Sequence, residues 1–90
     1  MAQEKKDHII GGCFDYARLH KQTALPLICI YDHPADYPDS FVARVWDASK
    51  PTHLVAIADT LEDIRTTIPP NMTRIPRHEK DDPTIVEVWI

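Results

Sequence analysis

The feature that most restricts the fold is the stretch Leu54–Ile68, in which an apolar run leads at once into a short amphipathic segment. Residues 54–58 are consecutive apolar residues, partly β-branched, which is typical of a buried strand. Asp59 and Thr60 follow, and both residue types are good helix N-caps. Pro69 then prevents the helix from continuing. The segment between has its apolar residues on one helical face: Leu61, Ile64 and Ile68. The stretch therefore predicts a strand, a sharp corner and a short helix.

Other parts of the chain also have the composition of strands. The apolar run Leu25–Tyr31 and the alternating run Phe41–Asp47 precede a third strand, His53–Ala58, and turn-rich segments join the three. A last strand is expected over Thr84–Ile90. The proline-rich connection before it, residues 69–83, leaves room for a brief extended piece at 72–75. These patterns favour an antiparallel meander followed by a helix and a final strand.

The predicted fold class is α+β, a two-layer domain with a mostly antiparallel four-stranded sheet in the order β-β-β-α-β. It contains one short helix, with an optional second helix over Cys13–Gln22. Ninety residues are enough for one domain. We expect residues 1–22 to form an N-terminal tail or helix and residues 23–90 to form a single α+β domain.

The charge and the cysteine content restrict the class of function. The net charge of −4 argues against direct nucleic-acid binding, which depends on Lys and Arg side chains that neutralise phosphates. No apolar run approaches the ~20 residues that a membrane helix needs. With two cysteines and no signal-peptide pattern, the chain is expected to be a cytoplasmic protein with no membrane association.

The sequence offers little support for a metal site or for catalysis. Only Cys29 and His33 approach zinc-ligand spacing, and there is no second matching pair, so no metal or other cofactor is predicted. The loop 32–39, which holds three aspartates, could instead form a small-molecule or divalent-metal site together with His33, Cys29 or His53. Turn formation also explains its composition. No nucleophile–base pair is apparent, and we predict that the protein is not an enzyme.

Strand alternation identifies a candidate interface. Placing the wholly apolar strand faces under the helix leaves two other sets on the far side of the sheet: Val42, Arg44 and Trp46, and Ile85, Glu87 and Trp89. If the two strands are neighbours, Arg44 can pair with Glu87, and the two tryptophans lie close together. One helix covers only one face of a sheet. The far face would then be covered by residues 9–22, by a second copy of the chain or by a partner protein.

The corner Ala-Asp-Thr-Leu-Glu-Asp-Ile, residues 58–64, and the order of the elements carry a resemblance to a known family. Residues 25–90 resemble the partial RNase-H-like domain of HicB-type antitoxins. The resemblance implies a small protein-binding domain and transfers no catalytic residue.

Our leading hypothesis is a small acidic, non-enzymatic protein-interaction module that binds another protein or itself. It would be an antitoxin-like or phage-encoded inhibitor of a nucleic-acid enzyme. Its interface would contain the six residues of the two far-face sets, because Trp and Arg are the commonest interface hot spots.

Overall fold

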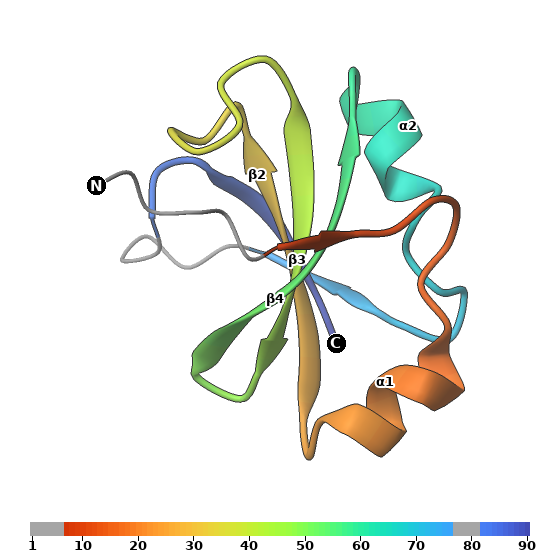
Figure 1. Ribbon diagram of the computed structural model, residues 1–90. Coiled ribbons are helices and arrows are strands. Elements are labelled where there is room, and N and C mark those ends of the chain that lie inside the picture. The colour runs from red at the N-terminus through yellow and green to blue at the C-terminus, as the bar shows by residue number, and fades with distance from the viewer. Residues whose placement is uncertain (1–6, 77–81) are drawn as a thin grey trace.

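In the computed structural model, which describes residues 7–76 and 82–90, these residues form a six-stranded mixed sheet and two helices (Figure 1). The helices are α1, Tyr16–Gln22, and α2, Leu61–Arg65. The strands are β1 His8–Ile9, β2 Pro26–Asp32, β3 Phe41–Asp47, β4 Lys50–Ala58, β5 Arg74–Ile75 and β6 Ile85–Trp89. The α+β class and the N-terminal helix are confirmed. The prediction of a four-stranded sheet is wrong.

The sheet has more strands than expected because a very short strand lies at each edge. The strand order is β1-β4-β3-β2-β6-β5; β1 pairs in parallel with β4, and the other pairings are antiparallel. Since β1 and β5 have two residues each, neither contains an alternation that sequence reasoning could detect. The extended piece expected over 72–75 is β5. Residues 77–81 of the predicted connection and residues 1–6 of the predicted tail lie outside the described residues.

Both helices begin at a side-chain cap. Asp15 Oδ1 accepts hydrogen bonds from the backbone N–H groups of Ala17 and Arg18 at the start of α1. At α2 the cap is Thr60, whose hydroxyl oxygen accepts from the N–H of Asp63 at 3.0 Å. After Arg65 the backbone continues in turns with bonds between residues three apart. The helix is therefore shorter than the predicted segment that reached Ile68.

The helices pack on the same face of the sheet, which we call the helix face (Figure 1). Its core combines residues that precede β2 and residues that follow β4 with alternate residues of the central strands: Phe14, Leu19, Ile28, Ile30, Ala43, Val45, Ala56, Ile64, Ile68 and Met72. We call the opposite side the helix-free face. Because α1 belongs to the helix face, the alternative in which residues 9–22 cover the far side is wrong for this helix.

A β-bulge interrupts the alternation of β6. Ile30 of β2 is opposite Glu87, whereas the next residue, Tyr31, is opposite Ile85, so Val86 is an extra residue on β6. A bulge shifts the side chains beyond it to the other face. Ile85 therefore lies on the helix-free face with Tyr31, and Glu87 lies on the helix face with Ile30.

Candidate functional site

The structure divides the predicted interface between the two faces of the sheet. Val42, Arg44, Trp46 and Ile85 lie on the helix-free face, and Glu87 and Trp89 lie on the helix face. Strand β2 separates β3 from β6, so the predicted pairing of Arg44 with Glu87 is wrong. The predicted proximity of the two tryptophans is wrong as well, because the bulge at Val86 reverses the faces of the residues after it.

The residues that remain together surround two hollows on the helix-free face, and Trp46 lines both of them. The larger hollow has a volume of about 510 Å³ and is lined by Tyr31, Pro34, Ala35, Asp36, Val42, Arg44, Trp46, Pro51, Thr52, His53, Asp82 and Thr84. The smaller has about 350 Å³ and is lined by Leu27, Cys29, Trp46, Ala48, Ser49, Ile75, Pro76, Ile85 and Val88. The Trp46 indole is therefore the shared wall of two adjacent hollows. We call this region the Trp46 site.

Arg44 is held at the edge of this site by a buried carboxylate. Its Nη1 donates to Asp7 Oδ1 at 2.8 Å, and its Nη2 donates to Asp7 Oδ2 at 3.0 Å, which makes the ion pair bidentate. Nη1 also donates to the Thr52 carbonyl, and Nη2 to Asp36 Oδ2. The side chains of Asp7 and Arg44 are only 8% and 13% exposed. Both terminal nitrogens of the guanidinium are thus engaged within the chain.

Two further side chains contact the same carboxylate. The Tyr37 hydroxyl donates to Asp7 Oδ2 at 2.8 Å, and His53 Nδ1 lies 3.2 Å from Asp7 Oδ1. The hydrogen bond from Arg44 holds the pKa of Asp7 well below its usual range, against the opposing effect of burial. Burial, and then the hydrogen bond to Asp7, raises the pKa of Tyr37 to about 12. Asp7 therefore stays ionised at neutral pH and fastens the start of β1 to the helix-free face.

A hydrogen bond from Trp46 Nε1 to the Tyr31 hydroxyl, 3.1 Å long, orients the central indole. Burial raises the pKa of Tyr31 to about 12, so this hydroxyl keeps its proton and can donate it to a bound group. Cys29 lies between Leu27 and Tyr31 on the same face and is 7% exposed. The site thus presents the Trp46 and Tyr31 rings together with polar side chains at the rim of the larger hollow, and aromatic residues with a polar group are common in protein interfaces.

Glu87 takes part in a separate network on the helix face. Its carboxylate accepts hydrogen bonds from Arg65 of α2, from Arg74 at 3.4 Å and from Trp89 Nε1 at 3.1 Å. Burial raises the pKa of Glu87, but the hydrogen bonds from Arg65 and Trp89 outweigh it, and the pKa lies below its usual value. This network joins α2 to β6 and belongs to the framework of the fold.

The candidate metal residues are not brought together. Cys29 is buried on the helix-free face, whereas the exposed His33 contacts Asp32 and the Phe41 ring. In the loop 32–39, the Asp36 carboxylate accepts a hydrogen bond from Arg44, and the Asp32 carboxylate contacts the His33 ring. Within residues 7–76 and 82–90, no group of three His, Cys, Asp or Glu side chains could hold a metal ion.

We call the side chains around the Asp7 carboxylate the Asp7 cluster: Asp7, Asp36, Tyr37, Arg44 and His53. Sequence reasoning missed two of them, Asp7 and Tyr37, as members of a site. Asp7 lies in a charged segment without periodicity, and it meets Tyr37 and Arg44 across 30 and 37 residues of sequence. No local pattern predicts such a contact. His53, a candidate for the small-molecule or metal site with the loop 32–39, instead contacts Asp7, and its position two residues before Val55, which is opposite Arg44, explains the contact.

No protein-family model, curated protein or solved structure matches this chain. The resemblance to HicB-type antitoxins therefore remains a hypothesis. Among the described residues, no helix is long and apolar enough to cross a membrane.

Proposed function

We propose that this chain is a small non-enzymatic protein-binding module and that a partner protein docks on the helix-free face at the Trp46 site. The observation that carries the proposal is the position of Trp46 between two hollows on a face that neither helix covers. Tryptophan is the residue most enriched among interface hot spots, particularly where it lies in a pocket near the centre of the contact. Apolar side chains of the partner would enter the hollows on both sides of the indole.

The charge of the chain favours a partner with a basic surface. The net charge is −4, and Arg44, the arginine at the site, is already paired with Asp7. Electrostatic complementarity raises association rates and selects partners of opposite charge. Nucleic-acid enzymes have basic substrate-binding surfaces. An antitoxin-like or phage-encoded inhibitor that covers such a surface is the specific form of the proposal, and the resemblance of residues 58–64 to HicB-type antitoxins is consistent with it.

The test is a quantitative capture experiment in the native host with matched variants. Ser49 is exposed and lines the smaller hollow, so Ser49→Arg places a bulky side chain in the site without disturbing the core. Ala17→Arg makes the same change of charge at an exposed position of α1. A captured protein would be purified and its affinity for wild type and for both variants measured by calorimetry.

We expect Ser49→Arg to weaken the affinity at least tenfold and Ala17→Arg to leave it unchanged. Docking at the Trp46 site would be contradicted if the two variants weakened the affinity equally, or if neither variant changed the affinity. Sedimentation of the purified chain examines self-association: a dimer that Ser49→Arg dissociates would identify a second copy as the partner.

A further inference from the structure

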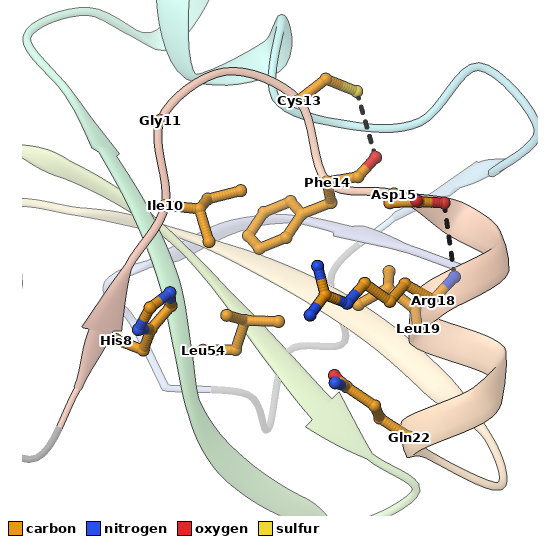
Figure 2. Close-up of a pocket in the computed structure, with 10 residues that line it drawn as sticks. All are labelled: His8, Ile10, Gly11, Cys13, Phe14, Asp15, Arg18, Leu19, Gln22 and Leu54. Carbon is orange, nitrogen blue, oxygen red and sulfur yellow. Dashed lines mark hydrogen bonds between the residues drawn. The ribbon is translucent and has the colours of Figure 1, made fainter.

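A third hollow lies on the other side of the molecule, between α1, the segment leading into it, and the paired strands β1 and β4 (Figure 2). Its volume is about 520 Å³. The floor is apolar and consists of Ile10, Phe14, Leu19 and Leu54. Phe14 and Leu19 are 4% and 2% exposed, so this floor is part of the packed core and has a fixed shape.

Polar side chains from both walls surround the apolar floor. Arg18 and Gln22 are four residues apart on α1 and therefore share one face of the helix. His8 comes from β1, on the opposite wall. Figure 2 shows the Arg18 side chain extending from α1 across the hollow toward the strands, with Gln22 beside it. These groups are placed to contact a single small molecule resting on the floor.

Arg18 differs from the other arginines of the described residues in its lack of a carboxylate partner. Arg44 binds Asp7, and Arg65 and Arg74 bind Glu87. The nearest acid to Arg18 in the hollow is Asp15, whose Oδ1 is used as the cap of α1 and accepts backbone N–H groups. Within residues 7–76 and 82–90, the guanidinium of Arg18 makes no hydrogen bond or ion pair. Its donors are thus available to an anion.

We infer that this hollow binds a small organic monocarboxylate with an apolar body. A guanidinium pairs with a carboxylate through two parallel hydrogen bonds, a geometry that a lysine cannot provide. The Gln22 amide and the His8 ring offer further donors, while the apolar body would lie on Phe14 and Leu54. Ligand sites are commonly apolar hollows with a few convergent polar groups. The Arg18 guanidinium supplies the positive charge of the hollow, and the Asp15 carboxylate is engaged as the cap of α1, so a ligand with a single negative charge matches the arginine.

The inference is tested by calorimetry on the full chain with butyrate, phenylacetate and octanoate as probes. Phenylacetamide serves as the neutral counterpart of phenylacetate, and acetate as a carboxylate without an apolar body. We expect at least one of the three probes to bind. Where phenylacetate binds, phenylacetamide and acetate should bind at least tenfold more weakly. In two-dimensional NMR spectra, the bound probe should shift the amide signals of residues 8–22 and Leu54 and leave those around Trp46 unchanged.

Two variants with the same change of charge assign the effect to Arg18. Arg18→Gln should remove the preference for the carboxylate, and Lys21→Gln, at an exposed position of α1 outside the hollow, should retain it. Because both residues are exposed, neither change should impair folding, which thermal melting verifies. Absence of binding by all three probes, equal affinity for phenylacetate and phenylacetamide, or equal losses in the two variants would overturn the inference.

Discussion

Asp7 ties the start of the described N-terminal segment, residues 7–22, to the helix-free face. Its carboxylate binds the Arg44 guanidinium through both oxygens and also contacts Tyr37 and His53, which come from a loop and from β4. An ion pair with so little exposure gains from its hydrogen bonds, but the loss of Asp7 leaves the Arg44 guanidinium with only the exposed Asp36 carboxylate and the Thr52 carbonyl as acceptors.

Asp7→Asn should therefore lower the free energy of unfolding by about 3 kcal/mol at pH 7. Because the pKa of Asp7 is depressed in the folded state, the unfolded state binds more protons at acidic pH. The stabilisation is complete above the unfolded pKa of about 3.9 and is lost as pH falls toward the folded pKa, by up to about 1.4 kcal/mol per pH unit. Urea unfolding at pH 7 and pH 3 measures both effects.

Asp39 provides the comparison for this experiment, since it is an exposed aspartate in the neighbouring loop. Asp39→Asn should change stability by less than about 0.5 kcal/mol at either pH. If Asp7→Asn showed the same small change, or if its deficit stayed constant between pH 7 and pH 3, the stabilising role of the Asp7–Arg44 pair would be refuted.

At the scale of the elements, β2 and β4 could be predicted from their apolar runs, β3 from its alternation and α2 from its N-cap and apolar face. The two-residue strands could not, since His8–Ile9 and Arg74–Ile75 are recognised only through the strands they pair with. The bulge at Val86 could not be predicted from the sequence either. The sequence of the last strand is consistent with an unbroken alternation, and only its register with Tyr31 and Ile30 reveals the extra residue.

The start of α2 allows a test at this scale, because the sequence offered two adjacent N-caps and the structure uses only Thr60. Replacing Thr60 by Ala removes the hydrogen bond to the N–H of Asp63 and should lower the free energy of unfolding by about 1 kcal/mol. Asp59→Ala should have a smaller effect. Thermal denaturation of both variants decides between the two caps, and a larger loss for Asp59→Ala would place the cap one residue earlier.

At the scale of the whole molecule, one core joins the N-terminal segment to the rest of the chain. Phe14 and Leu19 belong to the same buried cluster as Ile28, Val45 and Ile64, which come from β2, β3 and α2. The polar network at Asp7 adds a second attachment on the opposite face. Residues 7–22 and the later elements are therefore expected to unfold together in one cooperative transition.

A matched pair of leucine substitutions tests whether residues 7–22 and the later elements unfold together. Leu19 is 2% exposed and Leu25 is 58% exposed. Leu19→Ala leaves a cavity beneath α1 and should cost about 2–5 kcal/mol in a single unfolding transition, whereas Leu25→Ala should cost little. Circular dichroism and tryptophan fluorescence should give coincident denaturation curves. A loss confined to α1, with an unchanged main transition, would show that this segment folds independently.

The candidate site could be predicted only in part, because local sequence patterns show which residues share a strand face but do not show which strands are neighbours. The same limit applies to the whole fold. Strand β3 has a regular alternation, so Val42, Arg44 and Trp46 were correctly grouped on one face. Strand order is not encoded in local pattern, and β2 lies between the strands that were expected to be neighbours. The Asp7 cluster and the hollow around Arg18 depend on how distant segments meet, which no periodicity within either segment specifies.

The bulge at Val86 also gives the molecule two fluorophores in different surroundings. The Trp46 indole shares a hydrogen bond with a phenol at the proposed docking surface, whereas the Trp89 indole packs against the core and bonds to a carboxylate. In a Trp89→Phe protein, emission comes from the surface indole alone and reports occupancy of that surface. In a Trp46→Phe protein, emission reports melting of the interior. Two single-tryptophan proteins thus separate docking from denaturation by their intrinsic spectra, without an added dye.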